Sequence, residues 1–287
     1  MSHKKQHIIP ETYLKYFSPN NDGKNIKVLF LQSPHKRKIE SKNSGDSVFW
    51  KKDYYNSLQI KNPKLLELFL GQKIESNYNN LIYKISQEQA FDNNDFKIRF
   101  FEWVFYSKLR SPVWRIYIRR ILQQNGYTFK NESIELREEH LKLFFRNDYF
   151  ETVLKYYSDS LTFKRWVILI SPANYTWITS DNPGFSFNYT NLKPDKTSPK
   201  INPLWTDIEY DTLLYFPLTR KYCLLIEPYK KNDDVKLNLS NDKINFKRSN
   251  VTETQIINSW TALSANEYIL SSELIELAEF ETFLNCT

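Results

Sequence analysis

The stretch from Phe96 to Gln124 constrains the fold most, because its first half is apolar on nearly every side of a helix. Its large apolar residues are Phe96, Phe100, Phe101, Trp103, Val104, Phe105 and Leu109. A helix at the surface keeps a polar face, so a helix without one has to be covered on all sides. We therefore expect this helix to run through the middle of the domain, and Pro112 to kink or split it.

The preceding stretch, from Pro63 to about Gln87, has the pattern of a helix with one buried face. Apolar residues recur there at spacings of three and four, at Leu66, Leu70, Ile74, Tyr78, Leu81 and Ile85. Glu75 borders this stripe and is either a solvated charge or a carboxylate turned inward toward a buried cation. The helical pattern resumes over Glu135–Tyr157, where His140 lies among Glu and Lys residues and is expected to be exposed.

After Leu161 the hydrophobic pattern changes from helical to extended. Arg165–Ile170 is a continuous apolar run typical of a central strand, and residues 171–174 are predicted to turn it back into a hairpin with residues 175–180. Further strands are predicted at 26–32, 47–54, 212–216, 222–227 and 268–270, with a polar edge hairpin at 236–247. Thr252 and Gln255 form a capping box that predicts a helix to Ala265, and a closing helix follows from Ser272.

These elements predict an α+β fold, with a helical amino-terminal half packed on an antiparallel sheet and with carboxyl-terminal helices. Residues 1–287 are expected to form a single domain that is helix-rich over 1–160 and sheet-rich over 161–250, with closing helices over 251–287. The length of 287 residues and the hydrophobic fraction of 41% are ordinary for one large domain or two closely packed ones.

The extended residues 175–180 run directly into a polar turn, Asp181-Asn182-Pro183-Gly184. Pro183 suits the second position of a type II turn and Gly184 the third, which needs a positive φ. Asp181 would then end the strand, where a carboxylate is held rigidly and still reaches solvent. The alternative is that Asp181 and Asn182 only accept backbone hydrogen bonds within the turn.

The central helix also carries a run of basic residues. Arg110 shares a face with Trp103 and Trp114, and a guanidinium on a buried face needs a carboxylate or a phosphate because it keeps its charge. Residues 108–120 contain five basic residues and no acidic one, interleaved with aromatic rings. Charge beside a stacking surface suits nucleic acid, and a solvated basic helix face is the alternative. The candidate nucleic-acid contacts are Lys108, Trp114, Arg115, Arg119 and Arg120.

The rest of the composition excludes several classes of protein. No P-loop and no G-x-G-x-x-G motif occurs, so neither an ATPase nor a Rossmann enzyme is supported. Cys223 and Cys286 are the only cysteines, and neither has a companion at metal-ligand spacing. No stretch approaches the roughly eighteen apolar residues of a membrane span, and no signal peptide precedes the chain, so we expect a cytoplasmic protein. The net charge of +7 favours an anionic partner.

Four short motifs occur in a fixed order along the chain. They are His7-x-x-Pro10-x-x-Tyr13-Leu14-x-x-Phe17, Arg110-Ser111-Pro112, Thr179-Ser180-Asp181-Asn182-Pro183 and Phe216-Pro217-Leu218. With these motifs the chain resembles, over nearly its full length, a bacterial family catalogued as domain of unknown function 4238. In that family Glu75 and Asn258 match an acidic and an amide position, whereas the family prefers Arg-Thr-Pro to Arg-Ser-Pro. The resemblance implies a site at His7, Arg110 and Asp181 but no particular reaction.

His7, Glu75, Arg110, Asp181 and Asn182 together supply the groups needed to hydrolyse a phosphodiester. His7 would be the acid or base and Arg110 would hold the phosphate. Asp181 and Glu75 could instead bind Mg²⁺ or Mn²⁺, which prefer oxygen ligands. We therefore expect an intracellular, nuclease-like hydrolase of RNA or DNA, acting as a toxin or phage-defence effector.

The alternative is a non-catalytic module that binds a nucleotide or nucleic acid, in which Arg110, Glu75 and Asp181 form a structural ion-pair network. A protein–protein scaffold is a third reading, and the metal requirement and oligomeric state stay open. The family-like motifs are predicted to converge in space. Arg110 should pair with Asp181 or Glu75, and His7 should reach the same cleft.

Overall fold

The structure, a computed structural model, describes residues 5–32, 38–57, 65–89, 94–145, 164–188, 201–205, 211–228, 243–274, 276–278 and 280. Within these ranges the chain is an α+β protein whose strands form three sheets. Helices and strands alternate along the chain, so its amino-terminal half is not cleanly helical as predicted. The short strands β1 (Lys5–His7), β2 (Ile26–Phe30), β3 (Ile39–Lys42) and β4 (Trp50–Lys52) all precede the long helices.

The helices follow the predicted hydrophobic stripes closely. A short helix α1 (Glu11–Leu14) follows β1, and α2 (Leu65–Phe69) continues through a π turn and a 3-10 turn into α3 (Tyr78–Ser86). All six residues of the stripe predicted over 63–87 are buried. Pro112 splits the central helix into α4 (Asn94–Leu109) and α5 (Val113–Gln124), because a proline cannot donate a bond inside a helix. The helix α6 (Glu132–Phe145) packs beside α5.

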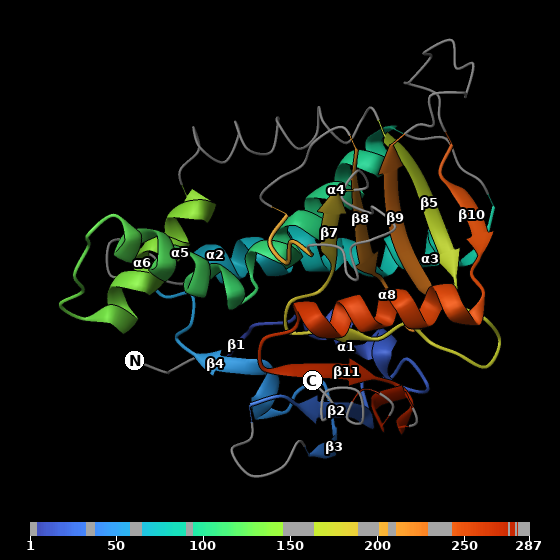
Figure 1. Cartoon of the computed structure of the whole chain (residues 1–287), viewed down its shortest axis with the longest axis horizontal. Helices are drawn as coiled ribbons and strands as arrows, with labels where there is room; N and C mark the ends of the chain where they lie inside the picture. The colour runs from blue at the N-terminus through green and yellow to red at the C-terminus, as the bar shows by residue number, and fades with distance from the viewer. Residues whose placement is uncertain are drawn as a thin grey trace, which may run out of the picture.

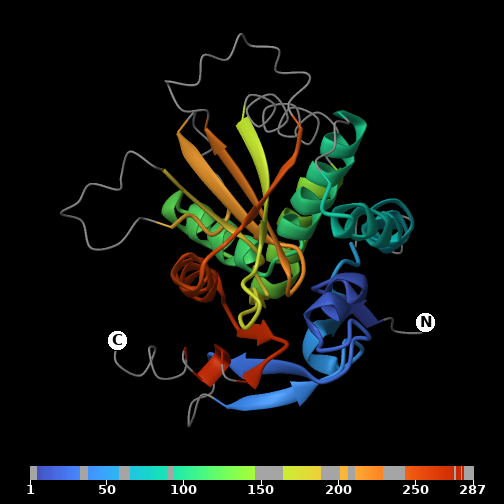
Figure 2. The same ribbon diagram turned by 90° about the vertical axis from the view of Figure 1, so that its right-hand side faces the viewer.

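The largest sheet has five strands in the order β10-β5-β9-β8-β7, where β10–β5 is its one parallel pair. Its strands are β5 (Lys164–Ile170), β7 (Phe185–Asn188), β8 (Thr212–Pro217), β9 (Tyr222–Pro228) and β10 (Asn245–Arg248). Alternate side chains of β5 point to opposite faces: Trp166 and Ile168 join the core around α3 and α4, while Val167 and Leu169 join the core around Ile257. The sheet therefore lies between α4 and α8 (Val251–Ser264), as Figures 1 and 2 show.

A four-stranded sheet, β3-β2-β11-β6, covers the other side of α8. It is completed by β11 (Tyr268–Ser271) and β6 (Thr179–Ser180), and the contact with α8 includes Ile178, Ala262 and Ile269. The first of the predicted carboxyl-terminal helices is thus a layer between two sheets. Helical residues also occur at 274, 276–278 and 280, where the closing helix was predicted.

Several predicted pairings are wrong. Residues 175–180 do not form a hairpin with β5, because β6 pairs with β11. Just before β6, backbone groups form hydrogen bonds with a side chain. The side chain of Asn258 accepts one from the Ile178 amide and donates one to the Thr176 carbonyl. Strand β2 pairs with β3 and with β11, while β4 pairs with β1. Of the predicted edge hairpin, residues 236–242 lie outside the described residues, and β10 runs parallel to β5.

The helix α8 begins earlier than its predicted capping box. The side-chain oxygen of Asn250 accepts a hydrogen bond from the Glu253 amide at 2.8 Å, so Asn250 is the N-cap instead of Thr252. Among the described residues, no helix is both long enough and apolar enough to cross a membrane.

Candidate functional site

Three of the predicted site residues meet where α4 ends. Arg110 is 1% exposed, and its guanidinium donates one hydrogen bond to the carboxylate of Glu75 and another to the backbone carbonyl of His7. Glu75 comes from the junction of the π turn and the 3-10 turn, and His7 from the end of β1. The predicted pairing of Arg110 with a carboxylate is therefore confirmed, and the partner is Glu75.

The charge on Arg110 is stabilised within the protein. Burial alone would lower the pKa of Arg110, but the carboxylate of Glu75 raises it, so the guanidinium stays charged. The guanidinium carbon also lies 5.6 Å from the ring centre of Tyr55. Since Glu75 and the His7 carbonyl already accept from the two terminal nitrogens of Arg110, a phosphate could bond these nitrogens only by displacing one of the two acceptors.

Among the described residues, the Nε of Arg110 has no hydrogen-bond partner, and one ring nitrogen of the His7 imidazole has none either. The His7 ring is half-buried, and the nitrogen without a partner is its Nδ1. Burial lowers the pKa of His7, and the charge of Arg110 lowers it further, against the opposing effect of Glu11 and Glu75. A neutral imidazole with a free nitrogen is able to take up or release a proton.

Asp181 and Asn182 form a separate, fully buried group. Asp181 is 1% exposed, so the expectation that its carboxylate reaches solvent is wrong. Its two oxygens accept hydrogen bonds from the amides of Asn266 and Glu267, both at 2.9 Å, so the bonds reach a distant segment and not the turn itself. Burial raises the pKa of Asp181 to about 6, although these backbone donors act in the opposite direction. Asn182 donates to the carbonyl of Ser264 at 2.9 Å.

Lys108 was predicted to contact nucleic acid, and that prediction is wrong. The residue is 1% exposed, and its Nζ donates to the side-chain oxygen of Asn182 at 2.8 Å and to the carbonyls of Pro183 and Gly184. Burial lowers the pKa of Lys108, and the nearby carboxylate of Asp181 raises it. Three oxygen acceptors match the three donors of an ammonium group, so Lys108 holds the turn against α4.

The remaining basic candidates lie on α5, at the outer end of the molecule (Figure 1). Arg119 and Arg120 are exposed, and Arg119 forms an ion pair with Glu132 of α6. Arg115 is half-buried, stacks on the ring of Tyr54 at 3.5 Å and donates to the carbonyl of the same residue at 2.7 Å. Trp114 is half-buried and packs against the main core, so it offers little free stacking surface.

His140 is buried, which contradicts the prediction that it is exposed. Its Nε2 lies 2.7 Å from the carbonyl of Leu109, and its Nδ1 accepts a hydrogen bond from Arg115 at 3.2 Å. These partners require a neutral ring with the proton on Nε2. Burial and then the charge of Arg115 lower the pKa of His140 to about 3. The histidine thus helps to position Arg115.

A pocket of about 450 Å³ lies between β4, α5 and α6. Its basic lining residues are Lys51, Lys52, Arg115, Arg119 and Arg137, and its acidic ones are Asp53 and Glu267. We call it the basic pocket. It includes two of the nucleic-acid contacts predicted from the sequence. The lysines come from β4, whose first residue, Trp50, pairs with His7, so the basic pocket and His7 share the β1–β4 ribbon.

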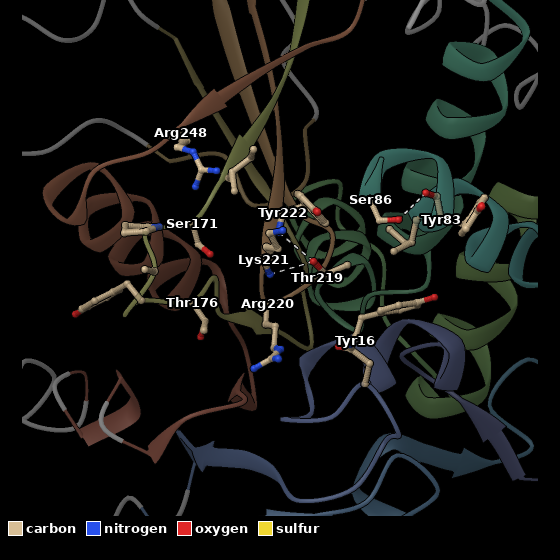
Figure 3. Close-up of a pocket in the computed structure, with 16 residues that line it drawn as sticks. Tyr16, Tyr83, Ser86, Ser171, Thr176, Thr219, Arg220, Lys221, Tyr222 and Arg248 are labelled. Carbon is tan, nitrogen blue, oxygen red and sulfur yellow. Dashed lines mark hydrogen bonds between the residues drawn. The ribbon is translucent and has the colours of Figure 1, made fainter. Parts of the chain in front are cut away.

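A second pocket, of about 550 Å³, lies between α3, the segment after β5 and the β8–β9 turn (Figure 3). None of the predicted site residues lines it. A sequence signal for this pocket is the basic pair Arg220-Lys221 beside Thr219, which lies between the strands predicted at 212–216 and 222–227. We call it the Arg220 pocket.

Metal ligation finds no support in the part of the chain that the structure describes. No group of three His, Cys, Asp or Glu side chains gathers there in a way that could hold an ion. The two carboxylates predicted as ligands of Mg²⁺ or Mn²⁺ are separately engaged, Glu75 by Arg110 and Asp181 by backbone amides.

Fold and site together define an α+β protein with a buried Arg–Glu ion pair and two pockets lined by basic residues, the basic pocket and the Arg220 pocket. The chain belongs to the family described as protein of unknown function (DUF4238), whose sequence model matches residues 5–273. The resemblance predicted from the four motifs is therefore confirmed. No curated protein and no solved structure matches the chain.

Proposed function

We propose that the protein binds nucleic acid through its phosphates, and that Arg110 and Glu75 form a structural ion pair. The observation that carries this proposal is the basic pocket, where five basic residues from β4, α5 and α6 face two acidic ones. Phosphate contacts by Lys and Arg supply most of the affinity of sequence-independent nucleic-acid binding.

The charges around the basic pocket favour an extended anion over a small one. Arg119 and Arg120 are exposed beside it on α5, and Lys52 is exposed on β4. Lys51 and Arg119 are partly neutralised at the surface by Glu267 and Glu132. Exposed ion pairs of this kind contribute little to stability, so a polyanion can exchange for the carboxylates at small cost.

Fluorescence anisotropy with labelled single-stranded RNA, single-stranded DNA and duplex DNA tests the proposal. Binding should be measurable at low salt. It should weaken steeply as the salt concentration rises from about 50 to about 200 mM, as expected for contacts to phosphates. Lys52→Ala with Arg119→Ala should weaken binding at least about tenfold and reduce the salt slope by about 2. Lys24→Ala with Lys247→Ala is the control, since it removes the same charge from exposed positions outside the basic pocket. Equal binding by the two double variants would refute the proposal.

Phosphodiester hydrolysis is the second candidate, and it is favoured by the buried Nδ1 of His7, which has no hydrogen-bond partner in the part of the chain that the structure describes. In that case His7 moves the proton, while the basic pocket on the same ribbon holds the strand. Labelled RNA and DNA incubated with and without Mg²⁺ or Mn²⁺ give the test. Cleavage that disappears in His7→Ala would support a nuclease, with a toxin or phage-defence role in the cytoplasm as its biological setting. No cleavage in any condition would leave the binding module alone.

A further inference from the structure

The Arg220 pocket has a lining suited to an anion that carries a ring. Among the described residues that line it, the charged ones are Arg220, Lys221 and Arg248, and none carries a carboxylate. Its volume of about 550 Å³ falls in the usual range for small-molecule sites, roughly 300–1,000 Å³. It shares no lining residue with the basic pocket.

Neither guanidinium group of the pocket has a carboxylate at ion-pair distance within the described residues. Lys221 pairs with Glu88, whose charge also attracts Arg248 from a longer distance. The other nearby carboxylate, Glu276, is 2% exposed and is bonded to the hydroxyl and amide of Thr176. Two arginines without an ion-pair partner among the described residues leave the pocket with an excess of positive charge that attracts an anion.

The backbone that carries these cations is fixed. The amide of Arg220 donates to the carbonyl of Tyr16 at 3.0 Å, and its carbonyl accepts from the Trp177 amide at 2.9 Å. On the far side, the residue after Arg248 donates from its amide to the carbonyl of Ile170 at 2.9 Å. Figure 3 places Arg220 and Arg248 on opposite sides of the hollow. Walls held in this way need little reorganisation when a ligand binds.

Tyrosine rings complete the lining on the α3 side. Tyr83 is 70% exposed although it is a large aromatic residue, and Tyr16 and Tyr222 line the same pocket. No core contact explains an exposed ring at that position, and a ring at the mouth of a basic pocket offers a surface on which a base can stack. Ser86 and Ser171 add hydroxyl groups that can bond a sugar or a base edge.

We propose that the Arg220 pocket binds a nucleoside phosphate, with Arg220 and Arg248 holding the phosphate and Tyr83 stacking on the base. A free nucleotide fits a pocket of this size. This pocket and the basic pocket are independent, so each can be removed without the other.

Isothermal titration calorimetry of the full chain tests this site with AMP, GMP, CMP and UMP, and with adenosine and inorganic phosphate as separate arms. At least one monophosphate should bind with a Kd below 1 mM, on the order of the weakest affinities of specific sites. Adenosine and inorganic phosphate should bind at least about tenfold more weakly than the best monophosphate, because adenosine lacks the phosphate and inorganic phosphate lacks the base. Absence of binding by all four monophosphates at 1 mM would overturn the proposal, and phosphate binding as tightly as a nucleotide would overturn the stacking role of Tyr83.

Variants assign the binding to the pocket. Arg220→Ala and Arg248→Ala should each weaken nucleotide binding about tenfold, the usual order for one charged hydrogen-bond partner. Tyr83→Ala should weaken it several-fold, and Tyr83→Phe should restore it. Lys247→Ala is the matched control, because Lys247 precedes Arg248 on β10 and lines a different pocket. Nucleotide binding unchanged in both arginine variants would place the site elsewhere and overturn the assignment. Lys52→Ala with Arg119→Ala should leave nucleotide binding intact, so failure of this site and failure of nucleic-acid binding are distinguishable.

Discussion

The ammonium group of Lys108 lies 2.8 Å from the side-chain oxygen of Asn182, although the two residues are 74 positions apart in the chain. The same asparagine donates to the carbonyl of Ser264, at the end of α8. Next to it, Asp181 accepts the amides of Asn266 and Glu267 just before β11. A single buried network therefore joins α4, the turn after β6 and the connection from α8 to β11. The motif that suggested catalysis holds three parts of the fold together.

Replacing Lys108 should destabilise the protein strongly. Lys108→Met keeps much of the buried volume but leaves three oxygen acceptors without their donor, and an unsatisfied buried group costs about 1–3 kcal/mol. We expect a loss of about 3 kcal/mol or more in the free energy of unfolding, measured by urea denaturation. Arg120→Met, on the exposed face of α5, is the control and should change it by less than about 0.5 kcal/mol. Equal effects would mean that the network contributes nothing to stability.

Two glycines allow backbone strain to be separated from steric clash. Gly184 and Gly126 have nearly the same positive φ, 77° and 79°. A Cβ at Gly184 would lie 2.6 Å from the Tyr215 carbonyl oxygen, whereas a Cβ at Gly126 would meet nothing within 4 Å. Gly126→Ala should therefore cost only the strain of a left-handed backbone, about 1–2 kcal/mol. Gly184→Ala should cost clearly more, because the carbonyl belongs to strand β8, and thermal melts of the two variants measure the difference.

The sequence predicted the helices and strands better than it predicted which strands pair with each other. The apolar stripe from Leu66 to Ile85 and the apolar run of β5 predicted a helical region and a strand correctly. Burial of one face of a helix gives apolar residues at a regular spacing, and burial of both faces of a strand gives a continuous apolar run. Pairing depends on contacts between distant segments, and nothing local indicates that Asn258 binds the backbone of Thr176 and Ile178 and keeps residues 175–178 from pairing with β5. The single-domain assignment stays a prediction.

At the candidate site, too, one feature was predicted correctly from the sequence and another was not. An arginine on an apolar helix face required a carboxylate. That argument left Asp181 and Glu75 as possible partners, and the structure shows the pair with Glu75, 35 positions away. Charge alone could not tell whether a basic residue faces solvent or the core. Lys108 and Arg120 belong to the same basic run, yet Lys108 is buried against a turn that the sequence places 74 positions downstream. The roles of His7, Arg110 and Asp181 in any reaction remain predictions.

Stability should fall in mild acid because of His140. The folded pKa of about 3 lies below the ordinary value of 6.5, so the unfolded chain binds the proton more readily and stability is lost as pH falls from 6.5 toward 3. Between pH 7.5 and pH 5 this loss is about 2 kcal/mol. His140→Gln keeps a donor for the Leu109 carbonyl and an acceptor for Arg115 but cannot titrate. Urea denaturation at both pH values should show a smaller acid loss in the variant, and an identical loss would exclude His140 as its source.

The last prediction separates a structural ion pair at Arg110 from a functional one. Arg110→Ala leaves the carboxylate of Glu75 without its partner and opens a cavity in the core, so it should cost about 3–5 kcal/mol in unfolding free energy. Glu75→Ala leaves a buried guanidinium uncompensated and should cost a similar amount. Because the two single changes break the same interaction, the double variant should lose clearly less than the sum of the two.

The exposed ion pair of Arg119 with Glu132 supplies the control for this cycle. Both of its side chains are more than two-fifths exposed, at 48% and 43%, and Arg119→Ala should cost no more than about 1 kcal/mol. Arg119→Ala should instead weaken nucleic-acid binding. At a temperature where it is still folded, Arg110→Lys should bind nucleic acid like the unmodified protein, since Arg110 is 1% exposed and does not line the basic pocket. Normal stability but lost binding in Arg110→Lys would reverse this assignment and make Arg110 the phosphate contact.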